Sequence, residues 1–344
     1  DSYTIQEYAR GLEYPWSLAF LPDGRALVTE KPGRLRVISA DGVLQPMPVQ
    51  GMPAIMYSGQ AGLFDVLPAM DFAKTREVFI SYACGTRKAN HTCVSRGTLN
   101  NNTLENLKEI FRSDFAKAGS AHYGGRMAWL PDNTLVIGLG DGFTYREEAQ
   151  NLSNHLGKVV RIKPDGSIPK DNPFVGRQGA KPEIYSYGHR NVQGLTYDPE
   201  SRRLIAHEHG PRGGDEVNII KPGVNYGWPV ATYGIDYTGA RISPFTEYEG
   251  TQQPEIYWVP SIAPSGITAY NGSMFPGWKG SLLVGALKAR QVSRVDLKAE
   301  QASTQEALFR EVGERIRDVR TGPEGAIYLL TDNAEGKILR VARP

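Results

Sequence analysis

The sequence predicts an all-β protein, a six-bladed β-propeller with four-stranded antiparallel blades, and three observations support this prediction. The 38 glycines and 23 prolines make up about 18% of the 344 residues, against roughly 12% in average proteins. One pattern of strand, turn and strand occurs six times along the chain. Helical periodicity is scarce by comparison. We therefore expect residues 1–344 to form one propeller domain of short strands and frequent reversals.

The repeated pattern is an apolar alternating strand, a turn built on Pro, Asp, Asn or Gly, and a second apolar strand. Its copies begin at Ser17, Gly62, Gly124, Gly194, Gly266 and Asp318. Short strands of alternating apolarity joined by turn residues predict β-hairpins. Six hairpins allow about 57 residues each, more than the roughly 40 to 50 of compact propeller repeats, which leaves room for outer strands and loops. A two-sheet sandwich would also explain many strands, but not six spaced copies of one pattern.

The composition excludes several classes of protein. Hydrophobic residues make up 40% and charged residues 22%, which fits a globular chain with a large core and excludes wholesale disorder. With 39 Lys and Arg, 37 Asp and Glu and no basic run, the chain lacks the electrostatic signature of nucleic-acid binding. No stretch approaches about 18 consecutive apolar residues, so we expect no membrane span. The chain begins at Asp1, which fits removal of a targeting segment or simple trimming.

The two cysteines, Cys84 and Cys93, are separated by eight residues. Apolar, strand-like residues flank both, and the Gly, Lys and Asn between them indicate a loop. A disulfide that closes a hairpin is therefore geometrically reasonable. Two buried free thiols are the alternative, and a metal site is less favoured because His91 is the only other soft ligand nearby.

The hairpin pattern predicts where polar residues gather. In an antiparallel hairpin the start of the first strand and the end of the second lie at the same end, so residues that flank the copies should meet on one rim of the central channel. Before the copies stand Tyr14, Trp16, Gln60, His122, Arg190, Asn191, Gln193, Ser261, Ser265, Arg315 and Arg317. After them come Glu30, Lys31, Tyr82, Asp141, Glu208, Gly210, Pro211, Lys288 and Asp332.

The predicted rim is richer in cations than in acids. The cations are Arg190, Lys288, Arg315 and Arg317, and the clearest acids are Asp141, Glu208 and Asp332. A concave site rich in Arg suits a ligand with several carboxylates or phosphates, because the guanidinium group pairs with such anions through two parallel hydrogen bonds. Each Arg taken singly is more often a solvated or salt-bridged rim residue, and it is the predicted convergence of the four cations that favours an anion-binding site.

Histidines supply the candidate proton acceptor and a candidate metal site. His122 and Asp141 flank the same hairpin, and a carboxylate beside an imidazole fixes its tautomer and raises its basicity, as a general base requires. A structural hydrogen bond between the two is the alternative. His207 and His209 alternate as strand neighbours and could face one side like metal ligands, but no third ligand is evident. Exposed carbonyls at the following Gly and Pro would suit Ca²⁺ better.

Several longer motifs make the chain recognisable. They are HYGGR, the GD of LGDG, LGKVVRI with DGSIPKDNPF, YGHRNVQGL, EHGPRGGDEVN, NYGWP, APSG, GALKAR and RIRDVRTGPEG. With these motifs in matching order from about Tyr14 to Val341, the chain resembles the soluble quinoprotein sugar dehydrogenases, and more closely the aldose sugar dehydrogenase branch of the glucose/sorbosone dehydrogenase family. Several long motifs in order are far more specific than a lone glycine pattern.

The resemblance implies a periplasmic or secreted six-bladed propeller that binds pyrroloquinoline quinone and Ca²⁺ and oxidises the C1 hydroxyl of aldoses to lactones. In that mechanism a histidine takes the hydroxyl proton while hydride passes to the quinone. The resemblance assigns the base to His122, the orienting carboxylate to Asp141, positions near the quinone carbonyls to Arg190 and Asn191, a site-lining position to Gln60, and the cationic clamp of the cofactor to Lys288, Arg315 and Arg317.

The resemblance also implies metal ligands. The carbonyls of Gly210 and Pro211 match ligands of the cofactor-bound Ca²⁺. A second, structural Ca²⁺ of some members corresponds to Glu216, Tyr226, Asp236 and, approximately, Glu255. Glucose-type members have an acidic residue directly before the catalytic His where this chain has Ala121, and their insertions for the sugar pocket and dimer contacts are short or absent here. Substrate preference and dimerisation are therefore not transferred, and a monomer is favoured.

Two other classes of function remain open at the level of sequence. A Ca²⁺-dependent propeller lactonase would favour a pocket centred on acidic and amide metal ligands, whereas the predicted rim is cationic. A non-catalytic propeller that binds carbohydrate or protein would need neither a base nor a clamp for carboxylates. The preferred sugar and the electron acceptor are not specified by any motif.

Overall fold

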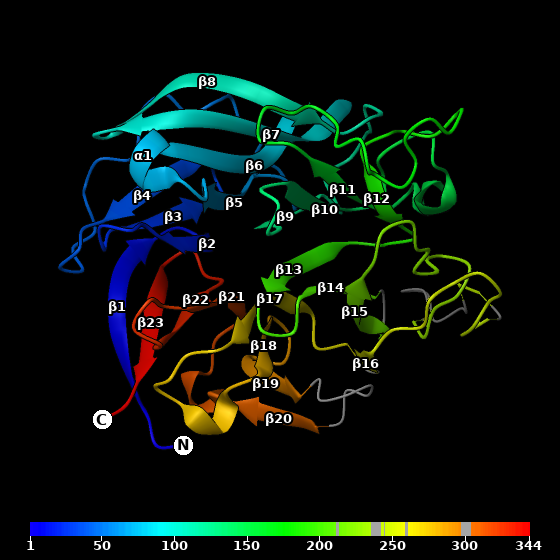
Figure 1. Cartoon of the computed structure of the whole chain (residues 1–344). Coiled ribbons are helices and arrows are strands. Elements are labelled where there is room, and N and C mark those ends of the chain that lie inside the picture. The colour runs from blue at the N-terminus through cyan, green and yellow to red at the C-terminus, as the bar shows by residue number, and fades with distance from the viewer. Residues whose placement is uncertain (211–212, 235–241, 244, 259–260, 297–303) are drawn as a thin grey trace.

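The computed structural model shows antiparallel β-sheets arranged in a ring (Figure 1). It describes residues 1–210, 213–234, 242–243, 245–258, 261–296 and 304–344. Within these residues there are six sheets, five of four strands and one of three. The predicted six-bladed propeller is therefore confirmed.

The first three blades follow one another along the chain, each with its innermost strand first in sequence. Blade 1 contains β2 (Pro15–Phe20), β3 (Ala26–Glu30) and β4 (Arg34–Ile38). Blade 2 contains β5 (Leu63–Pro68), β6 (Glu77–Thr86), β7 (Ala89–Asn100) and β8 (Thr103–Arg112). Blade 3 contains β9 (Gly124–Trp129), β10 (Leu135–Leu139), β11 (Lys158–Ile162) and β12 (Ile184–Tyr187).

The remaining blades complete the ring, and the last one closes it. Blade 4 contains β13 (Val192–Asp198), β14 (Arg203–Glu208), β15 (Asp215–Ile220) and β16 (Ile256–Trp258). Blade 5 contains β17 (Pro264–Tyr270), β18 (Ser281–Ala286), β19 (Gln291–Asp296) and β20 (Thr304–Leu308). Blade 6 contains β21 (Ile316–Thr321), β22 (Ile327–Thr331), β23 (Gly336–Ala342) and, as its outer strand, β1 (Thr4–Leu12). Pairing of the first strand with the last, Thr4 opposite Ala342, joins the two ends of the chain in one sheet.

The six copies of the sequence pattern are the six inner hairpins. Strands β2, β5, β9, β13, β17 and β21 contact their neighbours in cyclic order and so line the channel. Three of the hairpin turns have the same hydrogen bonds and place Gly24, Asn133 and Gly325 at φ of 90°, 63° and 95°. Gly and Asn tolerate this left-handed conformation, which explains why the turn motifs contain them.

Blade 1 lacks a fourth ladder strand for a local reason. After β4 the chain contains Pro46, Pro48 and Pro53 within a short stretch. Proline has no N–H to donate to a sheet ladder. The segment therefore pairs with β4 through an isolated bridge between Ile38 and Leu44 and single backbone bonds from Gln45 and Val49, without forming a strand.

The hydrophobic core is divided among the interfaces between blades. Each interface has its own cluster of buried residues, such as Leu27, Leu63 and Val66 between blades 1 and 2. A further cluster of aromatic and small residues, including Trp16 and Phe64, lies toward the channel. The short helices are α1 (Phe72–Thr75), η1 (Arg146–Gln150), η2 (Pro276–Trp278) and η3 (Arg310–Val312). Over the described ranges, no helix has the length and apolarity needed to cross a membrane.

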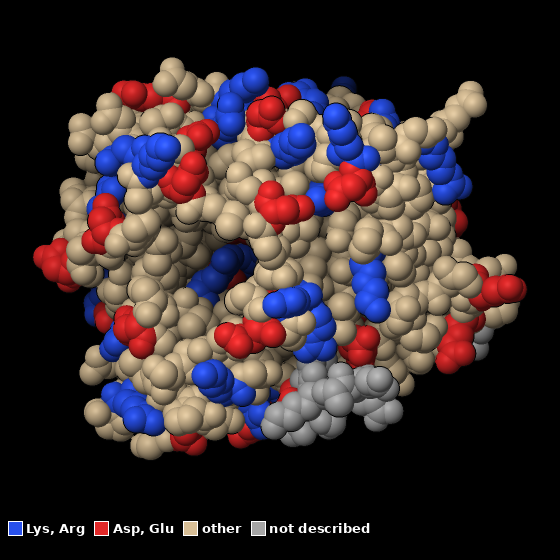
Figure 2. Space-filling model, in the orientation of Figure 1, with Lys and Arg blue, Asp and Glu red and all other residues tan. Residues whose placement is uncertain are grey.

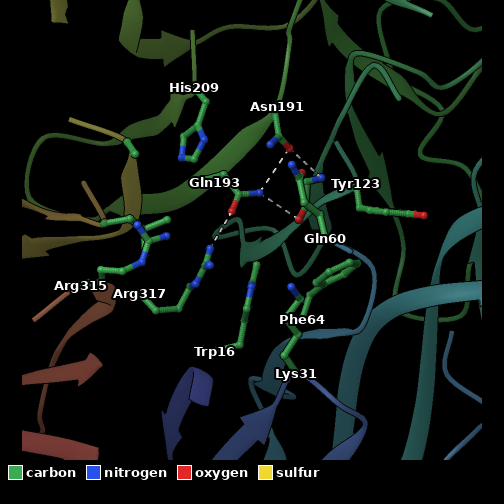
Figure 3. Close-up of a pocket in the computed structure, with 13 residues that line it drawn as sticks. Trp16, Lys31, Gln60, Phe64, Tyr123, Asn191, Gln193, His209, Arg315 and Arg317 are labelled. Atoms are coloured by element: carbon green, nitrogen blue, oxygen red, sulfur yellow. Dashed lines mark hydrogen bonds between the residues drawn. The ribbon is translucent and has the colours of Figure 1, made fainter. Parts of the chain in front are cut away.

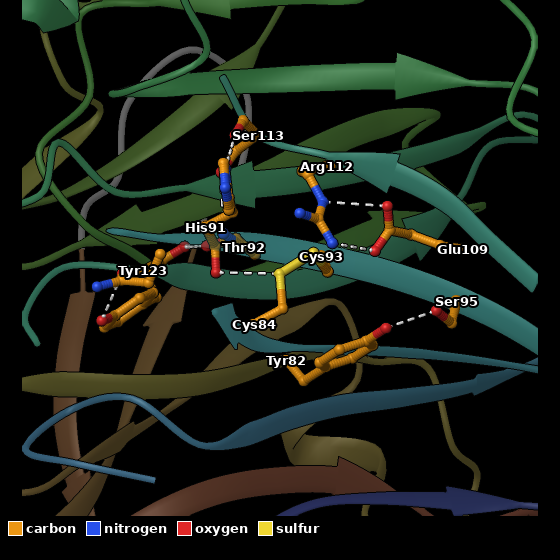
Figure 4. The surroundings of a disulfide bond; sticks show 11 residues. Tyr82, Cys84, His91, Thr92, Cys93, Ser95, Glu109, Arg112, Ser113 and Tyr123 are labelled. Atoms are coloured by element: carbon orange, nitrogen blue, oxygen red, sulfur yellow. Dashed lines mark hydrogen bonds and ion pairs between the residues drawn. A yellow bond between two sulfur atoms is a disulfide. The ribbon is translucent and has the colours of Figure 1, made fainter. Parts of the chain in front are cut away.

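The predicted disulfide is confirmed. Cys84 and Cys93 are bonded across the hairpin of β6 and β7, with their Cα atoms 6.0 Å apart (Figure 4). The strands continue beyond the disulfide to the exposed tip at Arg87 and Lys88. This hairpin extends beside the segment that leads to β9.

Candidate active site

A cavity of about 230 Å³ opens where the inner hairpins begin and end. All six blades contribute to its lining (Figure 3), which consists of Trp16, Lys31, Gln60, Phe64, Tyr123, Gly124, Asn191, Gln193, His209, Ala263, Leu287, Arg315 and Arg317. In the space-filling view the face around the channel is hollowed, and Lys or Arg atoms are visible inside the hollow (Figure 2). The residues that flank the inner hairpins are far apart in sequence, and the hairpin geometry places them around one cavity.

A buried guanidinium supports the cavity from within the channel. Arg126 is 1% exposed and donates hydrogen bonds to the carbonyls of Gln193 at 2.9 Å, Trp16 at 3.2 Å and Arg317 at 2.9 Å. Its guanidinium carbon lies 3.7 Å from the centre of the Trp16 ring. Arg126, in blade 3, therefore joins its own blade to the backbones of blades 4, 1 and 6 at three residues that line the cavity.

One wall of the cavity is aromatic. The ring centroids of Trp16 and Phe64 are 5.3 Å apart, and those of Phe64 and Tyr123 are 5.7 Å apart. All three residues are nearly buried. The Tyr123 side chain points away from the other cavity residues (Figure 3), so Trp16 and Phe64 supply the aromatic faces that suit a flat, conjugated ligand.

The opposite wall is cationic. Asp332 accepts bonds from Arg315 at 3.1 Å and from Arg317 at 3.3 Å, which fixes both guanidinium groups. The buried Nε of Arg317 has no hydrogen-bond partner among the described residues. Burial and the charge of Arg317 lower the pKa of Lys31 to about 8, against the attraction of Asp332. Three cations against one acid leave this wall able to bind an anion.

Amide side chains connect the two walls (Figure 3). Asn191 Oδ1 accepts bonds from the N–H of Gly124 at 3.1 Å and from Gln193 Nε2 at 3.3 Å. Gln193 Oε1 in turn accepts a bond from Arg317 at 3.4 Å. Gln60 Oε1 accepts the backbone N–H of His122 at 3.0 Å. These bonds fix the orientation of each amide group.

His122 and Asp141 form a buried pair beside the cavity. His122 Nδ1 lies 2.7 Å from Asp141 Oδ1, and both side chains are nearly inaccessible. The other carboxylate oxygen accepts a 2.8 Å bond from Trp228 Nε1, so the carboxylate is fixed from two sides. Since a carboxylate accepts and does not donate, Nδ1 carries the proton and Nε2 has a free lone pair, with no hydrogen-bond partner in the described part of the chain.

The surroundings of His122 keep its imidazole neutral. Burial lowers its pKa below the usual value, and the charges of Arg190 and Lys117 act in the same direction, while the bond to Asp141 opposes them. The backbone of His122 has φ of 56°, a left-handed conformation that residues other than Gly rarely adopt. The bond from its N–H to Gln60 and the bond from the Gly142 N–H to its carbonyl hold this strained position. A neutral, oriented imidazole is the form that accepts a proton.

Arg190 is held by a chain of buried polar groups. Its N–H donates to Glu208 Oε1 at 3.2 Å, and the other oxygen of Glu208 lies 2.8 Å from His189 Nδ1. His189 Nε2 continues to the hydroxyl of Ser186 at 2.8 Å. The guanidinium of Arg190 bonds the carbonyl of His209 at 3.2 Å. Ser186 and His189 are fully buried. The hydrogen-bonded chain of Ser186, His189 and Glu208 therefore holds the backbone of Arg190 in position.

The structure brings most of the sequence-predicted residues together. Gln60, Asn191, Arg315 and Arg317 line the cavity, and the buried His122, Asp141 and Arg190 lie next to it. Lys288 differs, because it is exposed at the end of β18 and is not among the lining residues. Its assignment to the cationic clamp stays a prediction.

His207 and His209 pack against blade 5 through its backbone. Their Nε2 atoms bond the carbonyls of Gly266, at 2.6 Å, and Pro264. Burial lowers the pKa of His207 to about 3 and that of His209 well below its usual range. Both imidazoles therefore connect neighbouring blades as neutral groups.

The predicted calcium ligands stay predictions. Pro211 and Asp236 lie outside the described residues. The Tyr226 hydroxyl bonds the backbone of Ile219 and Lys221. Burial and the charge of Glu208 raise the pKa of Glu216 well above its usual value. Across the described ranges, no three His, Cys, Asp or Glu side chains, Glu216 and Glu255 included, form a metal-binding group. Gly210 donates its N–H to Asp215 at 2.6 Å, which orders this turn.

The chain matches a family of known enzymes over nearly its whole length. The family model described as "Glucose / Sorbosone dehydrogenase" matches residues 12–340. The chain belongs to the glucose/sorbosone dehydrogenase family. It is therefore a dehydrogenase, as the sequence motifs predicted. The aldose sugar dehydrogenase YliI of Escherichia coli is 42% identical over 338 residues, which cover 96% of this chain and 90% of that protein.

Solved structures of the family agree over the whole chain. A crystal structure of a glucose dehydrogenase has 45% identity and a TM-score of 0.96, and covers 99% of this chain and 100% of its own. The PQQ-bound form of an aldose sugar dehydrogenase from Streptomyces coelicolor has 29% identity and a TM-score of 0.80, with 99% and 98% covered. The glucose/sorbosone dehydrogenase fold of this chain is thus shared by relatives of very different sequence.

Three residues of the site were missed by the sequence reasoning. Phe64 and Tyr123 line the cavity, and their place at the start of inner strands is the signal that could have found them. Trp228 bonds Asp141 across 87 positions of sequence. No local pattern indicates that contact, because the loop that carries Trp228 is outside the repeated hairpins.

Proposed function

We propose that this member of the glucose/sorbosone dehydrogenase family uses pyrroloquinoline quinone and Ca²⁺ to oxidise the C1 hydroxyl of aldose sugars to lactones. The observation that carries the proposal is the buried His122–Asp141 pair, in which the backbone N–H of His122 bonds Gln60, a residue that lines a cavity with one aromatic and one cationic wall. The naming of relatives as aldose sugar dehydrogenase and glucose dehydrogenase supports the substrate class.

The cavity fits this cofactor on three grounds. The aromatic rings of Trp16 and Phe64 in its lining match a flat tricyclic ring system. Its cationic wall matches the carboxylates of the quinone, and the unpartnered Nε of Arg317 supplies a donor for one of them. When bound, the quinone supplies the two-electron oxidation chemistry that amino-acid side chains lack.

The chain's own residues supply the proton transfer and the electrostatics. Oxidation removes a hydride from C1 and a proton from its hydroxyl, so that the C1–O bond becomes a carbonyl. His122 Nε2 accepts the proton, and Asp141 stabilises the imidazolium that forms. The buried Arg190 places a positive charge near the reacting groups, where negative charge develops.

Calcium belongs to the proposal through the family resemblance. The described residues supply one buried acidic pair, Glu208 opposite Glu216 in the ladder of β14 and β15, and the ordered turn at Gly210. These groups do not complete a coordination sphere, so no catalytic step is assigned to the metal. Removal of Ca²⁺ with a chelator, followed by repletion, measures its contribution directly.

The deciding experiment is reconstitution of purified apoprotein with pyrroloquinoline quinone and Ca²⁺, followed by aldose-dependent dye reduction. His122→Ala should lower turnover by about 10² to 10⁴ while quinone absorbance on the protein is retained. His91→Ala is the matched control. His91 lies on the disulfide hairpin, where it bonds the Ser113 carbonyl, and it does not line the cavity. No reduction with any monosaccharide or disaccharide, together with no bound quinone, would reject the proposal. Unchanged turnover in His122→Ala would reject His122 as the base.

We further propose a periplasmic or secreted location for the enzyme. Stable disulfides form in oxidising compartments and are rare in the reducing cytosol, and Cys84 and Cys93 are bonded. Fractionation of the native host with an antibody against the protein tests this location.

A further inference from the structure

Lys117 is a buried cation that the mechanism above does not use. It lies in the segment between β8 and β9, and only 2% of its surface is exposed. Its Nζ lies 3.7 Å from the centre of the Tyr123 ring and donates a 3.2 Å bond to the carbonyl of Ala121. A buried lysine without a carboxylate bonded to it is costly, so this position requires a reason.

The lysine contacts both segments that carry the buried pair. Ala121, whose carbonyl it bonds, directly precedes His122. Gly142, which directly follows Asp141, is packed so closely that a Cβ there would lie 3.0 Å from Lys117 Cδ. The side chain therefore contacts both the segment that carries His122 and the segment that carries Asp141, and its charge acts on both groups.

The disulfide hairpin fixes Lys117 through one buried residue. Asn90 and Lys117 exchange backbone hydrogen bonds of 2.8 and 2.9 Å. The Asn90 side chain donates to the carbonyls of Thr86 at 2.9 Å and Gly119 at 2.8 Å, and accepts the Tyr123 hydroxyl at 2.9 Å. Both the amide nitrogen and the amide oxygen of Asn90 are therefore hydrogen-bonded. Through this residue, the hairpin closed by Cys84 and Cys93 holds the backbone of Lys117 in a defined place.

We propose that Lys117 is a positioning residue that holds the His122–Asp141 pair in place and, by its positive charge, keeps the imidazole in its proton-accepting form. The inference rests on the proposed role of His122. Among the described residues, Asp141 favours protonation of that imidazole, while Arg190 and Lys117 disfavour it. Burial lowers the pKa of Lys117 to about 8 and the charge of Asp141 opposes this, so the ammonium is mostly charged at neutral pH.

The first test needs neither cofactor nor sugar. The pKa of His122 is measured by NMR titration of the apoprotein, with its signal among the six histidines assigned from a His122→Gln spectrum. Lys117→Met removes the charge, and Lys117→Gln removes it while keeping a donor for Ala121. Each should raise the pKa of His122 by about 1 unit. Lys88→Met is the matched control, because Lys88 is exposed at the tip of the same hairpin and its charge is screened.

The second test is the pH profile of kcat/KM for aldose oxidation by the reconstituted enzyme. Its acid limb should move upward by the same amount in both neutral variants, and Lys117→Arg should restore it. A titration shift with no aldose oxidation would retain the inference and reject the proposed function. A His122 pKa that moves by less than about 0.2 unit in folded Lys117→Met or Lys117→Gln would overturn the inference. So would failure of both neutral variants to fold when Lys117→Arg folds normally, because the residue would then be structural.

Discussion

Replacement of Arg126 by Met tests how the channel is held together. The variant keeps a long apolar stem but removes the guanidinium that bonds the carbonyls of Gln193, Trp16 and Arg317. Hydrogen bonds from a charged donor contribute about 1.5 to 3 kcal/mol each, so the three bonds together are worth roughly 5 to 9 kcal/mol before any compensation.

Two effects reduce the loss. Removing a fully buried charge recovers several kcal/mol of desolvation, and burial lowers the pKa of Arg126 to about 10 in spite of Asp318 and Asp65. Asp318 also keeps a second partner, since Arg320 lies 2.7 Å away. We therefore expect a net loss of about 3 kcal/mol. With an unfolding entropy of about 2.1 cal/mol/K per residue, this corresponds to a fall of about 4 °C in Tm.

Differential scanning calorimetry of Arg126→Met and of the wild type measures this change. Arg112→Met is the matched control, because Arg112 forms a half-exposed pair with Glu109 at 2.8 Å and such pairs contribute less than about 1 kcal/mol. Equal Tm values for Arg126→Met and Arg112→Met would refute the view that this guanidinium joins the blades.

Three further predictions concern pH, redox state and ligand affinity. The folded-state pKa of His207 is about 3, below the unfolded value, so below about pH 6 the unfolded chain binds a proton that the folded chain does not. Stability should then fall by up to about 1.4 kcal/mol per pH unit, and the slope should be smaller in His207→Gln when urea unfolding is followed from pH 6.5 to 4; an equal slope would contradict the assignment. Replacement of Cys84 and Cys93 by Ser should cost about 2 to 3 kcal/mol, as expected for a short closed loop, and reductant should lower the Tm of the wild type but not of the double variant. Arg317→Gln should raise the Kd for pyrroloquinoline quinone at least about tenfold in fluorescence titration, whereas an unchanged Kd would remove Arg317 from the clamp.

The fold was predictable because its signals are local. Each inner hairpin is formed by one continuous stretch of the chain, and its turn has residues such as Gly24 and Asn133 at the positions that need positive φ. Antiparallel pairing then places the flanking residues at one end of every hairpin. Gln60, Asn191 and Arg317 could therefore be assigned to one rim before any contact was known.

The contacts that make the rim a site depend on distant parts of the chain. Trp228 bonds Asp141 across 87 positions, and Arg126 reaches the Arg317 carbonyl across 191. Lys288 matches the cationic clamp by its motif and is an exposed residue that is absent from the cavity lining, whereas Lys31 lines the cationic wall. A short motif specifies residue types, but the direction of a side chain depends on neighbouring blades.

The sequence by itself determined the propeller, its six hairpins, the disulfide candidate and the pairing of His122 with Asp141. Alternation and turn chemistry act over a few residues, so they can be read without the rest of the chain. Only the tertiary structure decided the burial of this pair, the placement of Lys117 beside it and the packing of Arg126 in the channel. Burial and electrostatic environment are properties of all the blades together, because each blade supplies part of the low-dielectric surroundings in which these charges act.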